Sequence, residues 1–578
     1  MKNLFLLSLI GLLVSCSKKP KGEAPIPPFL VSENKNSTPT YEEGIAFWEK
    51  MAAYYDEISI EKYGMTDEGL PLHIVIVDGE RPKPLGAYKQ SLKQVLLINN
   101  AIHPGEPDGV DASMVLVHNL MTDPQKKQLL SKTSLVIIPF YNIGGTLNRN
   151  KFSRTNQNGP EEYGFRGNAQ NLDLNRDFIK CDSENAKTFA TLINELDPDL
   201  YIETHVSNGA DYQYVITYLS TQEDKIGGQL GKNLREAWTP FLKDKMSKQG
   251  FEMCPYVNVH NESPKQGYAT FYDQPRYSTG YLALLQIPGY ITETHMLKPY
   301  EQRVNATLAF LESGLELLDN VRIRNQKIAD RKELKTQKTF AIDWQIDSTS
   351  VSQILFKGYE SGYKPSEVTG EKRLFYNREK AYSANIPFYE YMKPTKTVET
   401  PKYYILKRGF VELEKRLLAN GVVLQEMGRD TVLEVTIYRI ETLETSTVPY
   451  EKHYFHYQTG ISKATQKVHI SKYDYVLKLD NNMKRFLIET LEPEAPDSYF
   501  NWNFFDAVLQ QKEWFSAYVF EDEAAEILKK DSVLNQKFME MKKDLNFAQN
   551  PQQQLVWIYQ NSHRYEKEHL TYPVFRVE

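Results

Sequence analysis

The amino-acid sequence predicts an α/β protein with a mixed, mostly parallel sheet that helices cover on both faces, followed by a β-rich and helical extension. Two observations lead to this prediction. Up to residue 320, short apolar stretches alternate with amphipathic ones, which is the pattern of strands and helices that follow one another in βαβ order. One of these stretches, residues 134–140 (SLVIIPF), is almost wholly apolar, as is typical of a strand buried on both faces.

The elements of the first half follow from periodicity and from stop signals. Helical spacing of apolar residues predicts helices, and short apolar runs predict strands. The pair Asp197-Pro198 ends one helix before the next strand begins. Between residues 142 and 178 lies a long polar stretch without regular structure, a feature that is usually functional inside a compact domain. The predicted helices are 41–55, 108–121, 183–196, 227–243 and 300–318, and the predicted strands are 72–77, 94–98, 134–140, 200–203, 215–219 and 289–292.

The character of the chain changes after 322–338, a charged run that is predicted to be helical or a linker. Alternating stretches such as 431–438 (TVLEVTIY) and 468–477 predict half-buried strands. A helix at 410–419, with Gly421 after it, interrupts them. Residues 503–570 are predicted to be mainly helical. The resulting organisation is 1–15 signal, 16–39 tether, 40–322 α/β domain, 323–338 linker, 339–500 β-rich accessory region and 501–578 helical region.

The N-terminus is read as a targeting segment. An apolar run at residues 4–13 follows a short positive start and is too short to span a bilayer, which fits a secretory signal. Its end, Leu-Val-Ser-Cys at 13–16, resembles a bacterial lipoprotein signal; the alternative is an ordinary signal peptide with a chance cysteine. The resemblance implies a protein exported to the periplasm or cell surface, lipid-anchored at Cys16, with a polar tether behind it.

Composition and cysteine content set further bounds. A chain of 578 residues that is 41% hydrophobic has room for large cores. The net charge of −6 gives no sign of a nucleic-acid partner. Cys181 and Cys254 could pair in an oxidising compartment, but their presence does not establish a disulfide. Oligomeric state is left open.

The stretch at 99–109 (NNAIHPGEPDG) carries the first two candidate metal ligands. It places His103 and Glu106 three residues apart on the turn leaving a predicted strand, where both side chains can bind one face of a metal ion. A second His-x-x-Glu, with His563 and Glu566 and then His569, lies in a charged tail and is better explained as a solvated helix face.

A third ligand is expected at His205, which directly follows the predicted strand 200–203. The ends of parallel strands meet at one edge of a sheet, so 99 residues of intervening strands and helices can bring His205 to Glu106. With His103 these side chains form a His₂Glu set, which suits catalytic zinc. Between them, residues 165–178 (FRGNAQNLDLNRDF) carry arginine and asparagine donors that suit a substrate carboxylate.

Taken together, these motifs resemble the zinc metallocarboxypeptidase family, the carboxypeptidase A-like peptidases. HPGE is similar to the family's His-x-x-Glu, NLDLNRDF to its segment written GVDLNRNF, and THVSNGAD places a histidine at the third ligand. ITETHMLKPY offers Glu293 for the late catalytic glutamate. The resemblance covers roughly residues 40–320 and implies a carboxypeptidase-like fold with one zinc ion.

The resemblance also implies roles, position by position. Asp173 is expected to orient a ligating imidazole. Asn175 and Arg176 are expected to grip the substrate's terminal carboxylate. Arg166 is expected to stabilise the oxyanion, with Arg154 as the second candidate.

Glu293 is expected to act as general base and acid. The nearest rival for the base is Glu203, which sits inside a strand two residues before a ligand. Asp177 departs from the family's usual asparagine, and the insertion GPEEYGF has no assigned place. The family's mobile tyrosine has no certain match, and Tyr277 is preferred over the two tyrosines at 272 and 281.

The predicted function is hydrolysis of peptide bonds by a zinc-activated water with a Glu general base, most simply the removal of C-terminal residues. One alternative is an amidohydrolase that acts on peptidoglycan stem peptides or N-acyl amino acids. A second is a surface binding protein on an inactive peptidase scaffold, although all proposed ligands and the glutamate are present. The sequence leaves open the side-chain preference and the role of residues 340–578.

Overall fold

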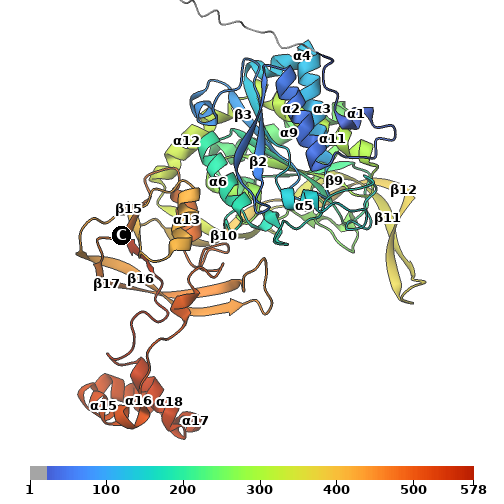
Figure 1. Ribbon diagram of the computed structural model, residues 1–578. Helices are drawn as coiled ribbons and strands as arrows, with labels where there is room; N and C mark the ends of the chain where they lie inside the picture. Colours follow the sequence, from blue (N-terminus) through green and yellow to red (C-terminus); the bar gives the residue numbers. More distant parts are fainter. Residues whose placement is uncertain (1–21) are drawn as a thin grey trace, which may run out of the picture.

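The computed structural model describes residues 22–578 (Figure 1). The predicted signal segment 1–15 and the predicted lipidation site Cys16 lie outside the described residues. Within residues 22–578, no helix has both the length and the apolar character needed to cross a membrane.

An eight-stranded sheet forms the centre of the N-terminal half, in the order β1-β2-β4-β3-β5-β9-β6-β7. The four central strands β4, β3, β5 and β9 run parallel to one another, while β1, β2 and the β6–β9 pair introduce antiparallel contacts. This confirms the predicted mixed, mostly parallel sheet. The strands are β1 Ile58–Met65, β2 Pro71–Val77, β3 Gln94–Asn99, β4 Thr133–Ile138, β5 Leu200–Ser207, β6 Ile216–Ser220, β7 Met253–Pro255 and β9 Gly289–His295.

Both faces of this sheet are buried because side chains alternate along each strand. In β3, Leu96 belongs to the core on one face and Leu97 to the core on the other. The first core is covered by α2 (Tyr41–Tyr54), α3 (Asp108–Thr122), α9 (Thr239–Lys248) and α11 (Tyr300–Asn320). The second is covered by α6 (Glu184–Leu196), α10 (Ser278–Leu284) and parts of the C-terminal half.

Most predicted elements of the first half are present, and the main differences are the following. β5 and β9 run past their predicted ends, so His205 and Glu293 lie within strands. The predicted helix 227–243 is three consecutive helical segments, Gly228–Asn233, Leu234–Trp238 and α9, the middle one a π-helix. The stretch 142–178 contains a short helix α5 (Ile143–Leu147) and a 3₁₀ turn Leu174–Arg176. β1, which is half-exposed and mixed in polarity, was not predicted.

The C-terminal half contains three further sheets. β10 (Thr339–Ile346) pairs with β13 (Met392–Glu399), and the long hairpin β11 (Ser352–Pro365) and β12 (Lys372–Tyr389) joins β8 (Tyr268–Ala269) of the first half. The third sheet has six strands in the order β15-β18-β14-β19-β16-β17. Its strands are β15 Gln425–Glu426, β18 Tyr475–Lys478, β14 Tyr403–Leu406, β19 Val574–Val577, β16 Thr431–Thr445 and β17 His456–Ile470.

Two sequence predictions for this half are corrected. The predicted strand 468–477 spans the end of β17, a turn and β18, because Asp474 accepts a hydrogen bond from the Ser471 backbone and closes the turn between them. The last strand β19 lies between β14 and β16, so the chain returns to the sheet after the helical region.

The helical region forms a separate group at one end of the molecule (Figure 1). It has its own small core, which includes Phe520, Phe538 and Leu555. Residues 561–570 that follow are turns rather than the predicted helix. The helices are α15 Ala517–Lys530, α16 Ser532–Met541, α17 Leu545–Ala548 and α18 Pro551–Gln560.

The segment predicted as a linker forms helix α12 (Ile323–Thr336) and packs on the first half. Arg324 pairs with the buried Asp199 (2.6 Å), and Arg331 pairs with Asp197 (2.8 Å). The core behind the second sheet face continues into the C-terminal half through α13 (Val411–Ala419) and α14 (Lys484–Leu491). The two halves therefore share one apolar core.

Candidate active site

The turn after β3 carries the first two predicted ligands into the interior. His103 and Glu106 are both buried, and the Glu106 backbone N–H donates to the His103 carbonyl (2.8 Å), which closes the turn. Helix α3 begins two residues later and packs tightly against β5. A Cβ on Gly109 would come within 2.0 Å of the Thr204 hydroxyl, so only glycine lets the helix approach the strand this closely.

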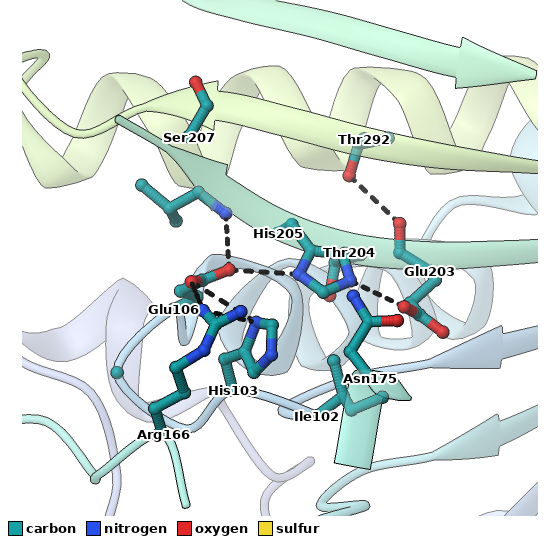
Figure 2. A network of polar contacts seen from close by, with 12 residues as sticks. Ile102, His103, Glu106, Arg166, Asn175, Glu203, Thr204, His205, Ser207 and Thr292 are labelled. Atoms are coloured by element: carbon teal, nitrogen blue, oxygen red, sulfur yellow. Dashed lines mark hydrogen bonds and ion pairs between the residues drawn. The ribbon is translucent and has the colours of Figure 1, made fainter. Parts of the chain in front are cut away.

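His205 projects from β5 toward the same point (Figure 2). The Nδ1 atoms of His103 and His205 lie 3.4 and 3.1 Å from the Glu106 carboxylate oxygens, and one ligand atom from each residue falls within 4.8 Å of the others. Two imidazole nitrogens and one carboxylate converge in a buried position, and this donor set fits a zinc ion with an open coordination position. The predicted metal residues are therefore brought together.

A carboxylate orients each imidazole from behind. The Nε2 of His103 lies 2.9 Å from Asp173 Oδ1, as the resemblance implied. The Nε2 of His205 lies 2.6 Å from Glu203 Oε1 (Figure 2). Each imidazole thus turns Nδ1 toward the common point, an arrangement that carboxylates hydrogen-bonded to the other ring nitrogen impose on zinc-ligating histidines.

In the sequence, Glu203 is only a rival candidate for the general base. The structure gives it a different position, because it is fully buried and accepts hydrogen bonds from Tyr201 and His205 rather than facing the cavity. The signal was present in the sequence. Residues two apart on a strand share one face, so Glu203 and His205 had to point the same way.

Glu293 lies beside His205, since the parallel pairing of β5 and β9 puts these two residues in register. Its side chain lines the cavity, and no hydrogen-bond partner of the carboxylate is found within the described residues. Burial raises the pKa of Glu293 to about 8, assisted by the nearby Glu106 and opposed by His205, Arg154 and Arg166. A carboxyl group whose pKa lies near neutral pH is suited to accept and return a proton.

The two candidate arginines have different surroundings. Arg166 reaches the front of the ligand set, with Nη1 3.3 Å from His103 Nδ1, while its Nε donates to Asp173 (2.9 Å). Arg154 donates to Glu106 (2.7 Å) and to the Val206 carbonyl (2.9 Å). Both arginines line the cavity, but the Arg166 side chain is 45% exposed and that of Arg154 only 16%.

The predicted carboxylate anchors line the same cavity, which has a volume of about 490 Å³. The side-chain oxygen of Asn175 is buried and has no hydrogen-bond partner among residues 22–578. The Arg176 guanidinium lies 4.7 Å from the centre of the Tyr277 ring, a cation–π contact. The cavity is also lined by Leu219, Tyr256, Phe271, Asp273, Thr279 and Ile291.

Of the three tyrosines weighed in the sequence, only Tyr277 lines the cavity. Tyr281 is fully buried and donates to Asn420 (2.6 Å). Tyr256, which the sequence analysis did not consider, also lines the cavity, and burial together with the charge of Glu293 raises its pKa. No motif surrounds Tyr256 in the sequence, so only the fold could reveal it.

The ligand set carries strongly perturbed charges. Burial opposes charge on His205, but its contacts with Glu106 and Glu203 outweigh this and raise its pKa to about 10. Burial also opposes ionisation of Glu106, but Arg154 and His103 hold its pKa well below the usual value. Strong perturbation at a cavity wall is typical of functional sites.

Other candidate features are not part of this site. Cys181 and Cys254 are both free and buried, so they do not pair. In the C-terminal cluster, His569 contacts the Leu509 carbonyl (3.2 Å) and Glu566 accepts from the Lys512 backbone (2.6 Å). These contacts are structural, and within residues 22–578 only His103, Glu106 and His205 form a group able to hold a metal ion.

The fold and the His₂Glu set beside Glu293 define the site of a metal-dependent hydrolase. Residues 45–207, which include all three candidate ligands, match the family model described as zinc carboxypeptidase. This match agrees with the predicted resemblance, and it supports zinc as the cofactor and the assignment as a zinc hydrolase. Glu293 lies beyond the matched residues.

Similar solved structures include a metallo-carboxypeptidase from Burkholderia cenocepacia, at 16% identity and a TM-score of 0.38, over 50% of this chain and 70% of that one. A metallo-carboxypeptidase from Pseudomonas aeruginosa is 14% identical, with a TM-score of 0.37, over 49% and 70%. Carboxypeptidase A from Helicoverpa armigera is 14% identical, with a TM-score of 0.36, over 49% and 74%. A comparison with curated proteins gave no match.

Proposed function

We propose that the protein is a zinc exopeptidase that removes residues from the C-terminus of peptides. The observation that carries this proposal is the meeting of three groups in one cavity. The metal set His103, Glu106 and His205 lies at one wall, and Glu293 stands in register with His205. Asn175 and Arg176 line the same cavity and supply donors for a carboxylate.

The roles of the residues follow from these positions. Zinc bound by the three ligands supplies Lewis-acid activation of water and of the substrate carbonyl. Glu293 takes a proton from the attacking water and returns it to the leaving amine. Arg166, whose Nη1 faces the ligand set, stabilises the oxyanion by charge and hydrogen bonding, an effect typically worth about 3 kcal/mol per donor.

Substrate binding is assigned to Asn175 and Arg176 in the same cavity. Arg176 is held against the Tyr277 ring, which limits the freedom of its guanidinium. The buried side-chain oxygen of Asn175 has no partner in the part of the chain that the structure describes, which leaves it available to a ligand. A planar guanidinium with an adjacent amide binds a terminal carboxylate well, which favours peptides whose free C-terminus lies at these two residues.

The test compares one peptide with a free C-terminus, the same peptide with an amidated C-terminus, and a muropeptide. We expect stepwise loss of single residues from the free peptide and at least 100-fold slower cleavage of the amidated one. Equal cleavage of both peptides would remove the exopeptidase assignment. Cleavage of the muropeptide alone would support the amidohydrolase alternative.

The base is tested by Glu293→Gln, which keeps the side-chain shape but removes the proton-accepting carboxylate. We expect hydrolysis to fall by at least about 10³-fold while zinc content stays at one ion per chain. Unchanged turnover would exclude Glu293 as the base. If neither the wild type nor the variant shows turnover although both bind zinc, the alternative of an inactive binding protein would be favoured.

We also propose that the protein is exported and anchored to a bacterial membrane by lipid at Cys16. The signal-like residues 4–16 and the polar stretch behind them support this proposal. In a bacterial host, metabolic labelling with a fatty-acid analogue should mark the wild type and not Cys16→Ser. Labelling of both proteins would place the lipid elsewhere, and labelling of neither would exclude the anchor.

A further inference from the structure

The turn that joins β16 to β17 reaches the active-site loop from the C-terminal half. We call residues 446–455 the hairpin tip. At its end, Tyr450 and His453 exchange backbone hydrogen bonds (2.8 and 3.0 Å) around the two residues Glu451 and Lys452. Two central residues between such a pair form the tight turn of a β-hairpin.

This turn carries backbone strain. Glu451 and Lys452 have φ values of 47° and 72°, in the left-handed region where Asn and Gly are favoured. Side chains such as Glu and Lys pay a conformational penalty there. Residues that hold sparsely populated conformations often do so because a particular side chain is needed at that place.

The Glu451 side chain points into the catalytic half. Its Oε2 accepts a hydrogen bond from the Asp173 backbone N–H (2.8 Å). The Asp173 carboxylate in turn contacts His103 Nε2 (2.9 Å) and accepts from Arg166 Nε (2.9 Å). Glu451 therefore fixes the backbone of the residue that orients one zinc ligand and the proposed oxyanion arginine.

The hairpin tip is itself held firmly against the catalytic half. His453 Nε2 lies 2.6 Å from the buried Asp182. The Arg276 guanidinium lies 4.8 Å from the centre of the Phe455 ring and 5.1 Å from that of Trp502. Arg276 also donates to Asp497 (2.9 Å), so contacts on both sides keep the tip in place.

The charges around Glu451 suit a structural acceptor. Asp173 and burial raise the pKa of Glu451, whereas the Asp173 N–H, Lys180 and Arg176 favour its charged form. No residue of the hairpin tip lines the active-site cavity. Glu451 thus acts through the Asp173 peptide and not through contact with a substrate.

We propose that Glu451 is a positioning residue for the active site, which the C-terminal half supplies to hold Asp173, and through it His103 and Arg166, in place. This proposal rests on the proposed function in one respect, because both assume that His103, Glu106 and His205 bind zinc. Without this contact, the loop 165–178 loses an anchor and the His103 imidazole loses its fixed orientation.

The test uses the full-length protein and three variants. Glu451→Asn supplies the residue that the turn prefers, so thermal stability should hold or rise, while the shorter side chain withdraws its acceptor from Asp173. Glu451→Gln keeps the length and an acceptor oxygen. Lys452→Asn is the matched control, since it relieves the same turn at an exposed neighbouring position.

Two measurements are made on each protein: the zinc dissociation constant by chelator competition, and amide hydrogen exchange across residues 165–178. Glu451→Asn should weaken zinc binding by about 10-fold and speed exchange at Asp173 by at least 10-fold. Glu451→Gln should stay within about 3-fold of wild type in both, and Lys452→Asn should match wild type.

The outcomes separate this proposal from the proposed function. Unchanged zinc affinity and unchanged exchange in a folded Glu451→Asn protein would overturn the positioning role. An equal loss in Lys452→Asn would also overturn it, because the effect would then belong to the turn. If zinc affinity follows the predicted order but no peptide is cleaved, the positioning role stands and the exopeptidase assignment fails.

Discussion

The two histidines of the metal set are held in contrasting ways. His205 stands in a central strand, oriented by Glu203 two residues earlier and flanked by Glu293 on the next strand. His103 stands on a turn, oriented by Asp173 seventy residues later, whose backbone is fixed by Glu451 of the C-terminal half. We refer to these as the sheet side and the loop side.

The difference teaches where the site is robust and where it depends on distant parts of the chain. The register of β5 and β9 sets the sheet side, and it is formed within the α/β domain. The loop side depends on ion pairs and hydrogen bonds that cross between the two halves. Changes in the C-terminal half should therefore affect the loop side first.

The largest expected effect is on Asp182, whose contacts hold the hairpin tip against the catalytic half. Asp182 is buried and accepts from Lys180 Nζ (2.9 Å) and Arg416 Nη2 (2.6 Å), in addition to its contact with His453. Asp182→Ala would leave buried cations without their partner, so we expect a loss of about 3–5 kcal/mol in the free energy of unfolding.

Denaturant titration measures this loss. Glu412→Ala is the control, because Glu412 is 63% exposed and its ion pair with Arg416 should contribute under about 1 kcal/mol. A similar small change in the free energy of unfolding of both variants would mean that the Asp182 contacts do not stabilise this region.

A second prediction concerns Asp111, on the helix packed beneath the sheet side. Burial raises the pKa of Asp111 to about 7, and Tyr300 donates to its carboxyl group. The folded protein therefore keeps this proton to a higher pH than the unfolded chain, whose aspartates titrate near about 3.9. The stability that protonated Asp111 contributes to the folded protein is fully present below pH 4 and is lost as pH rises through 7.

Asp111→Asn removes this titration while keeping an acceptor for Tyr300. Relative to wild type, the variant should gain up to about 4 kcal/mol of stability between pH 4 and pH 8. Thermal melts at both pH values measure the gain, with the exposed Asp244→Asn as control. A constant difference across this range would show that Asp111 titrates normally.

The smallest expected effect compares the two orienting carboxylates directly. Glu203→Gln and Asp173→Asn should each weaken zinc binding by about 10- to 100-fold. Glu203 is fully buried and paired with Tyr201 as well as His205, so its variant should also lose about 1–3 kcal/mol of stability. Asp173→Asn should change stability less.

Zinc titration and thermal melts on the same preparations test this contrast. Equal loss of stability in both variants would mean that the sheet side and the loop side do not differ in the way described. A variant of Glu203 with unchanged zinc affinity would remove the role assigned to that carboxylate.

The residues that lie in local motifs could be predicted from the sequence on both the sheet side and the loop side, for a physical reason. Apolar runs and short motifs are local, so β3, β5 and the triplet His103, Glu106 and His205 follow from patterns within a few residues. Glu203 could have been found as well, since strand alternation places it behind His205. Its role was missed because a carboxylate near a metal was weighed only as a base.

The rest depends on contacts between residues far apart in the chain. Nothing near Glu451 in the sequence marks it as a partner of Asp173, because the two are 278 residues apart. The return of β19 between β14 and β16 is likewise set by the whole sheet rather than by its own four residues. The half-exposed β1 lacks the clear alternation that identifies a strand.

The shared core has a practical consequence for dissecting the molecule. Side chains such as Leu406, Leu417 and Phe486 cover apolar groups on the second face of the main sheet. A fragment ending near residue 322 would expose that face to water and would be prone to self-association during expression. Point substitutions in the intact polypeptide are therefore the sounder route to assigning what each half contributes.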